Sequence, residues 1–319
     1  KAIMPLFSSE MIDTYRDRVH ATSDAFLDGL DTSQPILMYE ELKRLSMAIN
    51  LDIFLGIRDP EFVDKVYGIA TTHWHGIISV PMNVRMPLVM SSTYRKAIDA
   101  KGELLDIIDA KLKSSDAPNF LRSFAESGMD IELVKNHILV FICALIPKAS
   151  SSILNSFIDT SSLWFEQYVD SNVGISDEAL RSILLEIIRL FPPFVGGLRV
   201  AEKDTDLGPF HVPKGHGLFY ATFMAHRDPA VFPRPDDFLP ERWTTFNRND
   251  ADKMFGFGAG GHRCVGENLM WDVLAIVARK LIQKFQWTIG EDEPFPPQIK
   301  YLPVARPANL VPRMMQRRT

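Results

Sequence analysis

The segment from Phe257 to Gly266 constrains this chain more than any other, because it sets a cysteine among glycines directly before a long apolar helical pattern. A cysteine at the start of a helix faces unpaired backbone N–H groups, which stabilise a thiolate and lower its pKa. Glycines on both sides let the backbone approach a flat cofactor closely. The segment therefore predicts a thiolate site at Cys264.

Two other interpretations of this segment stay open at this point. Gly256, Gly258 and Gly261 satisfy the pattern G-x-G-x-x-G, and a helical pattern follows, as in a phosphate-binding loop. No strand pattern precedes it, however, and no βαβ unit surrounds it. Alternatively, Cys264 is an ordinary buried cysteine, which is the usual fate of a lone cysteine and the interpretation that suits Cys143.

The spacing of apolar residues predicts a mainly α fold with a small β portion. A first helical pattern begins at Ser9. Further helical patterns cover Tyr39–Leu55, Arg95–Leu112, Glu132–Ile158, Ser176–Pro192 and Cys264–Phe285. Pro147 interrupts the fourth pattern and predicts a kink, because proline removes a backbone hydrogen bond. Glycine, proline and aspartate around short β-prone runs between Leu198 and Gly217 predict hairpins. The long irregular segment His226–Phe257 is typical of a functional region.

Composition excludes several classes of protein. The net charge of −5 indicates no broad basic face and hence no nucleic-acid partner. Two cysteines are too few for a disulfide framework and suit a reducing compartment. No signal peptide is visible, and the longest apolar candidate, His137–Pro147, is too short to span a membrane and predicts a buried helix. The first residues resemble the tail of a helix, so we expect further sequence upstream.

The Cys264 segment resembles the haem-binding signature of the cytochromes P450, Phe-x-x-Gly-x-x-x-Cys-x-Gly. The resemblance implies that Cys264 is the metal ligand, bound to the iron of haem b, with Phe257 packed beside the sulfur. It places His262 where the family has a basic residue that contacts a haem propionate, and Arg199 where an arginine pairs with a propionate. The cofactor-binding residues implied in this way are Phe257, Gly258, His262, Cys264, Gly266 and Arg199.

Other marks of this family follow in the expected order. Glu186 and Arg189 match its Glu-x-x-Arg pair, and Pro240-Glu241-Arg242-Trp243 resembles its Pro-Glu-Arg-Phe. The resemblance implies a structural triad of Glu186, Arg189 and Arg242 that positions the thiolate loop. Taken alone, the first pair is better explained as an ordinary surface ion pair, worth under ~1 kcal/mol, because such pairs are common.

The sequence departs from the family pattern in three places. The N-terminal portion of the family is absent, and the spacer before Glu186 is short, which predicts a reduced or missing helix. The acid and threonine that relay protons to iron-bound oxygen are replaced by Pro147 and Lys148, and neither can do acid–alcohol chemistry. Lys148 and Ser151 are the catalytic candidates in their place, with Ser150 and Ser152 as alternatives. Lys148 could equally be a lysine that extends out of the pocket.

The resemblance covers nearly the whole chain, which we expect to be one cytochrome P450 domain over residues 1–319, the C-terminal three-quarters or so. It implies a monomeric monooxygenase that inserts one oxygen atom from O2 into a lipid-, sterol- or terpenoid-like molecule, with an NADPH-dependent reductase or a ferredoxin as electron donor. The retinoic-acid and sterol hydroxylases are the most similar branch. The alternatives are a peroxygenase- or isomerase-type enzyme and a non-catalytic haem binder. An endoplasmic-reticulum location is implied if upstream sequence carries an anchor, and a cytoplasmic one otherwise.

Overall fold

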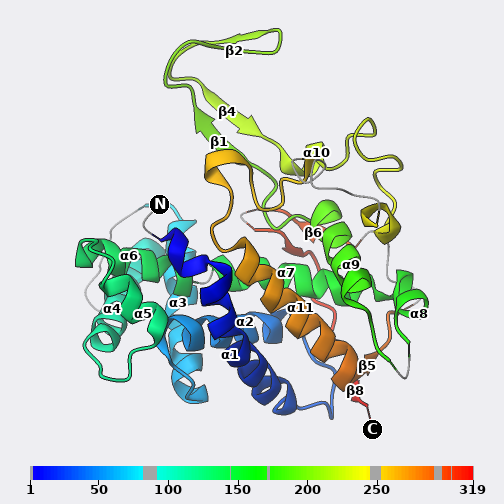
Figure 1. The fold of residues 1–319 in the computed structure, drawn as a ribbon, viewed down its shortest axis with the longest axis horizontal. Helices are drawn as coiled ribbons and strands as arrows, with labels where there is room; N and C mark the ends of the chain where they lie inside the picture. Colours follow the sequence, from blue (N-terminus) through cyan, green and yellow to red (C-terminus); the bar gives the residue numbers. More distant parts are fainter. Residues whose placement is uncertain are drawn as a thin grey trace.

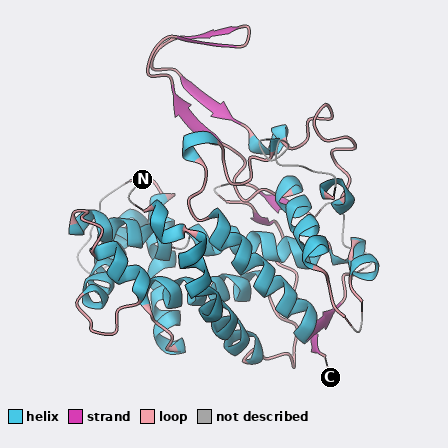
Figure 2. Ribbon diagram, viewed as in Figure 1, coloured by secondary structure: helices cyan, strands magenta, loops and turns pink. Residues whose placement is uncertain are grey.

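The computed structural model describes residues 3–81, 92–143, 145–170, 173–244, 253–290, 297–302 and 304–318 (Figure 1). Helices dominate the described chain and its strands are short (Figure 2), so the predicted mainly α fold with a small β portion is confirmed. The longer helices are α1 Ser9–Asp28, α2 Met38–Leu55, α3 Pro60–Ile77, α4 Thr93–Leu112, α6 Ile131–Ile142, α7 Leu145–Asp159, α9 Asp177–Leu190 and α11 Glu267–Lys284. The short ones are α5 Asn119–Ala125, α8 Phe165–Tyr168 and α10 Thr222–Ala225.

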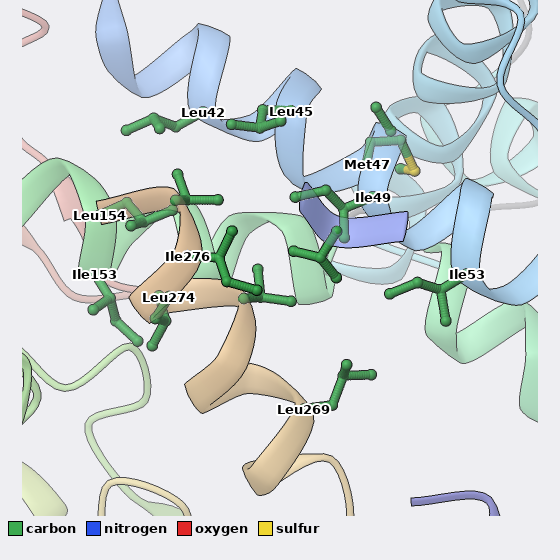
Figure 3. Close-up of a cluster of buried hydrophobic side chains, with 14 of the residues drawn as sticks. Leu42, Leu45, Met47, Ile49, Ile53, Ile153, Leu154, Leu269, Leu274 and Ile276 are labelled. Carbon is green, nitrogen blue, oxygen red and sulfur yellow. The ribbon is translucent and has the colours of Figure 1, made fainter. Parts of the chain in front are cut away.

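The core lies between α1, α2, α7 and α11, with contacts between α1 and α2, α2 and α7, α7 and α11, and α1 and α11. Figure 3 shows Leu42, Leu45 and Ile49 of α2 facing Ile153 and Leu154 of α7 and Ile276 of α11. These side chains are at most 8% exposed. Burial of each of these side chains stabilises the fold by about 1.5–3 kcal/mol, so the packed helices form a stable core.

The long apolar pattern around Pro147 forms two helices rather than one kinked helix. α6 ends at Ile142, Cys143 adopts an extended conformation, and α7 starts at Leu145. The break precedes Pro147 by four residues because a proline ring clashes with the carbonyl of residue i−4. The freed Phe141 carbonyl accepts a hydrogen bond from Asn50 Nδ2 at 3.1 Å.

The stretch Ile131–Asp159, taken across this break, is long and apolar enough to cross a membrane by composition. It is therefore longer than the apolar stretch predicted from sequence. Of its most apolar window, 75% is buried inside the protein. Its hydrophobicity is accordingly used in packing against the neighbouring helices, as predicted for a buried helix.

The spacer between α7 and α9 is short, as the sequence predicted. Its described residues contain only the 3-10 turn Ser161–Leu163 and the four-residue α8. Ser176 caps α9 by accepting a hydrogen bond from the Ala179 backbone N–H at 3.1 Å. Helix α9 ends at Leu190, just before the proline pair predicted to stop it.

The β portion consists of antiparallel pairs. β1 Gly197–Val200 pairs with β4 Gly217–Tyr220, and β2 Thr205–Leu207 pairs with β3 Phe210–Val212. Together they form an arm that extends away from the helices (Figure 1), so the predicted hairpins are confirmed. Near the C-terminus, β5 Phe285–Trp287 pairs with β8 Met315–Arg317, and β6 Ile299–Lys300 pairs with β7 Arg306–Pro307.

Candidate functional site

The cysteine loop is folded by its own backbone. The Cys264 N–H donates to the Phe257 carbonyl at 2.7 Å, and the Gly258 N–H donates to the Phe255 carbonyl at 2.9 Å. A 3-10 turn, Gly260–His262, closes the loop before α11 begins at Glu267. Cys264 therefore stands at the mouth of α11, where the sequence placed it.

Two glycines in this loop have conformations that other residues adopt with difficulty. Gly258 has φ +77° and Gly260 has φ +58°. A Cβ atom at position 258 would also lie 3.1 Å from the His262 carbonyl oxygen. The close approach of the two sides of the loop explains why Gly258 belongs to the site.

The Cys264 side chain is exposed rather than packed into the core. Even so, the surrounding loop desolvates the sulfur enough to raise the pKa of Cys264, while the Gly266 backbone N–H lowers it. The pKa of the free thiol therefore shifts opposite to the direction predicted from the helix terminus, because desolvation outweighs that effect. A bound metal ion reverses this balance, since a coordinating thiol loses its proton outright.

Phe257 forms one side of the loop. Its ring lies 5.5 Å from that of Trp271 on α11, centroid to centroid. This contact fixes the phenyl group and, through the Phe257 carbonyl, the backbone of Cys264. Aromatic pairs of this kind contribute about 0.5–1.5 kcal/mol beyond their buried area.

Arg199 and His262 line one cavity of about 270 Å³, together with Phe255, Ala259 and Tyr220. Arg199 comes from β1 and its guanidinium lies 5.0 Å from the Tyr220 ring centroid. One of its nitrogens donates to the Leu198 carbonyl at 2.8 Å. Among the described residues, neither Arg199 nor His262 has a carboxylate within ion-pair distance, which leaves donors for an anionic group.

Behind the loop lies a buried charged network centred on Glu186 and Arg189 of α9, both 0% exposed. Arg189 binds the Glu186 carboxylate through two hydrogen bonds of 2.8 and 2.9 Å. Arg242 donates to the same carboxylate at 3.1 Å, and Trp243 Nε1 donates to it at 2.8 Å. The alternative of an ordinary surface pair is therefore wrong, because Glu186 and Arg189 are both fully buried and hydrogen-bonded.

Arg189 also holds the irregular segment in place. Its guanidinium donates to the carbonyls of His226, Pro235 and Asp237, at 2.9, 2.5 and 3.0 Å. A single side chain thus fixes three points of a segment without regular structure. Sequence reasoning identified the triad but missed these acceptors, because backbone carbonyls leave no mark in a sequence.

His226 connects this network to the cysteine loop. Its Nδ1 lies 3.1 Å from the Arg189 carbonyl, and its Nε2 accepts a hydrogen bond from the Phe255 N–H at 2.8 Å. The second bond requires an unprotonated Nε2. Burial lowers the pKa of His226 to about 4, which keeps the ring neutral. From the sequence, His226 was recognised only as the first residue of the irregular segment.

The two catalytic candidates on α7 lie in different surroundings. Lys148 is partly buried, with its ammonium 5.4 Å from the Trp74 ring centroid. Ser151 is 0% exposed, and its hydroxyl donates to the Lys148 carbonyl at 3.1 Å. Ser150 and Ser152 are each 2% exposed. Lys148 borders a cavity that includes no residue of the cysteine loop.

The competing interpretations gain no support from the structure. No strand leads into Gly256–Gly261 in the described part of the chain, so the context of a phosphate-binding loop is missing. The described residues contain no group of three or more His, Cys, Asp or Glu side chains able to hold a metal ion. A lone thiol such as that of Cys264 would suit a metal cofactor that brings its other ligands with it.

The chemistry of the site fits a haem. Haem is a flat iron cofactor with two carboxylates. The exposed Cys264 offers a ligand for the iron, and the two loop glycines with positive φ allow a close approach to a flat ring. Arg199 and His262, which line one cavity, offer donors for the carboxylates. The buried network is connected to the loop through His226, which contacts both Arg189 and the Phe255 N–H.

Comparisons with known proteins agree with this assignment. The sequence model of the cytochrome P450 family matches residues 178–310. Beta-amyrin 28-monooxygenase of Barbarea vulgaris is 23% identical over 97% of this chain and 70% of its own length. Cytochrome P450 26A1 of Danio rerio is 23% identical over 98% of this chain and 70% of its own.

Solved structures share the fold. The retinoic acid-bound cyanobacterial CYP120A1 superposes with a TM-score of 0.82 at 22% identity, covering 99% of this chain and 77% of that one. A likeness at this identity establishes the fold. The haem-binding signature in the cysteine loop and the Glu-x-x-Arg pair on α9 are the features that suggest a function.

Proposed function

Because the chain belongs to the cytochrome P450 superfamily, we propose that Cys264 supplies the thiolate ligand of haem b in an enzyme that oxygenates an apolar small molecule. The observation that carries the proposal is the exposed residue Cys264 directly before α11, in a loop that His226 links to the Glu186–Arg189 network. A haem held in this way supplies the activation of O2, and the thiolate donates electron density that favours O–O cleavage.

The residues of this chain hold and orient that cofactor. We propose that Arg199 and His262 bind its propionates, since both face one cavity and Arg199 offers charge-assisted bonds. Gly258 and Gly266 let the loop lie close to the ring, and Phe257 packs beside the sulfur. Glu186, Arg189 and Arg242 keep the loop in register and take no part in bond making.

The proposed substrate is a lipid-, sterol- or terpenoid-like molecule. The relatives that support this are a beta-amyrin monooxygenase and a structure with bound retinoic acid. In this proposal the protein is a single-domain monomer, and a separate reductase or ferredoxin supplies the electrons. A cytoplasmic location, or attachment to the endoplasmic reticulum through an upstream anchor, would bring it to those partners.

The ligation is tested by the absorption spectrum of the reduced carbon-monoxide complex. We expect the whole protein to give the band of a thiolate adduct and Cys264→Ser to lose it. Cys143→Ser is the matched control, because that cysteine is buried at the break between α6 and α7 and should leave the band unchanged. A normal band in Cys264→Ser would overturn the proposal.

A second candidate is a peroxygenase- or isomerase-type enzyme, favoured by Pro147 and Lys148 where the family has its acid and threonine. Of the two proposed catalytic residues, Lys148 places its ammonium group near the break between α6 and α7. The Ser151 hydroxyl already donates a hydrogen bond to the Lys148 carbonyl. Product formed with hydrogen peroxide but not with reductase and NADPH would support this candidate. Product formed only with reductase would exclude it, and no product under either condition would favour a non-catalytic haem binder.

A further inference from the structure

A second cavity, of about 350 Å³, lies between α2, α3, α7 and the β6–β7 pair. None of the residues that line it belongs to the cysteine loop or to the Arg199 cavity. Its walls come from four parts of the sequence that are far apart, so the fold itself assembles the cavity.

This cavity gathers positive charge. Lys43 of α2, Lys148 of α7, Lys300 of β6 and Arg306 of β7 all line it, and Glu40 is the one acidic residue among the lining residues. Glu40 is engaged by Lys43, at 2.6 Å. Four cations against one anion leave an excess of three positive charges.

Lys148 and Lys300 have no ion-pair partner among the described residues, and the Arg306 guanidinium donates to the Leu302 carbonyl at 2.7 Å. The charges of Lys43 and Arg306 add to burial, the larger cause, in lowering the pKa of Lys148 to about 8. The cations thus act on one another within a partly desolvated space, where their repulsion is poorly screened. A bound anion would relieve this repulsion.

The remaining walls are apolar and aromatic. Trp74 and Ile78 of α3 lie on one side, and Val304 and Leu310 lie near the β6–β7 pair. Ile78 and Leu310 are 48% and 45% exposed, so both offer uncovered apolar surface. A ligand that matches both features has a single negative group and an apolar body.

We propose that this cavity binds the carboxylate of an apolar acid, with Lys148, Lys300 and Arg306 as its cationic contacts. This anion site does not depend on the proposed function, because no residue of the cysteine loop lines the cavity. The interpretation assigns Lys148 to ligand recognition rather than to proton transfer, which suits a side chain that has donors and no acceptor.

The test compares decanoate with decan-1-ol, which share a chain and differ in charge, by titration calorimetry on the whole haem-loaded protein. We expect decanoate to bind at least about tenfold more tightly, as for a hydrogen bond to a charged group. Lys148→Gln and Arg306→Gln should each remove most of that preference and leave decanol binding unchanged. Lys300→Gln should reduce it too, and because Lys300 is exposed this variant should not impair folding.

Lys96→Gln is the matched control, since it removes the same charge from an exposed position on α4. Equal binding of acid and alcohol would overturn the inference, as would a preference that survives all three substitutions. The carbon-monoxide spectrum of each variant separates this outcome from the proposed function. A lost thiolate band in the unaltered protein, with the preference for decanoate intact, would overturn the proposed function and leave the anion site standing.

Discussion

The two sides of the cysteine loop differ in how many partners the protein itself provides for their polar and charged groups. Behind the loop, Glu186 and Arg189 are fully buried, and each of their charged groups meets several hydrogen-bond partners. In front of it, Cys264, Arg199 and His262 are exposed, and among the described residues neither Arg199 nor His262 forms an ion pair. If the proposed function holds, the buried rear side keeps the loop rigid and the exposed front side supplies the ligands of the cofactor. An unpaired charge would then destabilise the rear side, whereas on the front side it would bind the cofactor.

The largest effect expected from this contrast is at Glu186. Glu186→Gln removes the charge shared by two arginines and leaves both buried, which should lower the free energy of unfolding by about 3–5 kcal/mol. Urea denaturation measures it. Glu267→Gln breaks the Arg263–Glu267 pair on the front side, where Arg263 is 41% exposed, and should cost under about 1 kcal/mol. Equal costs at the two positions would erase the distinction between rear and front.

The link between the two sides is His226, and it predicts a dependence on pH. The pKa of His226 is about 4 in the folded protein, below its ordinary value of 6.5. The unfolded chain therefore binds the proton more readily, and stability should fall as the pH drops from about 6.5 towards 4. The loss reaches about 3 kcal/mol at most, from a shift of that size.

Replacement of His226 by Gln should flatten this dependence, measured as the unfolding free energy at several pH values. His20→Gln, at an exposed position on α1, removes the same ring from solvent and should leave the slope as it is. A slope that persists unchanged in His226→Gln would assign the acid sensitivity to other groups.

Local sequence patterns predicted most of the rear and front but not the link between them. Glu186 and Arg189 are three residues apart on one helix, and the cysteine loop is a continuous segment, so both leave a mark in the sequence. His226 meets Arg189 and Phe255 across 37 and 29 residues, and such pairings depend on the path of an irregular segment. The hydrogen bond from the Trp243 indole to Glu186 likewise could not be predicted, because the sequence shows the residue but not its partner.

Helix α3 was missed although its signal was present. Asp59 caps it by accepting from the Phe62 N–H at 3.2 Å, and Pro60 occupies its first turn, as expected for a helix start. The sequence analysis placed the interruption of the long helix at Pro147 rather than at Cys143 for a different reason. Proline acts on the preceding turn, so the residue that disturbs a helix is not the residue at which it breaks.

The smallest predicted effect separates backbone strain from the close packing of the front loop. Gly258 and Gly128 have nearly the same φ, +77° and +75°, but nothing lies within 4 Å of a Cβ built at Gly128. Gly128→Ala should therefore cost about 1 kcal/mol, the price of a left-handed conformation alone. Gly258→Ala carries the same strain plus a contact of 3.1 Å with the His262 carbonyl, and should cost about 1 kcal/mol more. Urea denaturation of the two variants gives the difference directly, and the rate of haem loss should rise in Gly258→Ala alone. If the two glycines proved equally tolerant, the loop would have room to adjust, and its geometry would depend on the bound cofactor rather than on the chain.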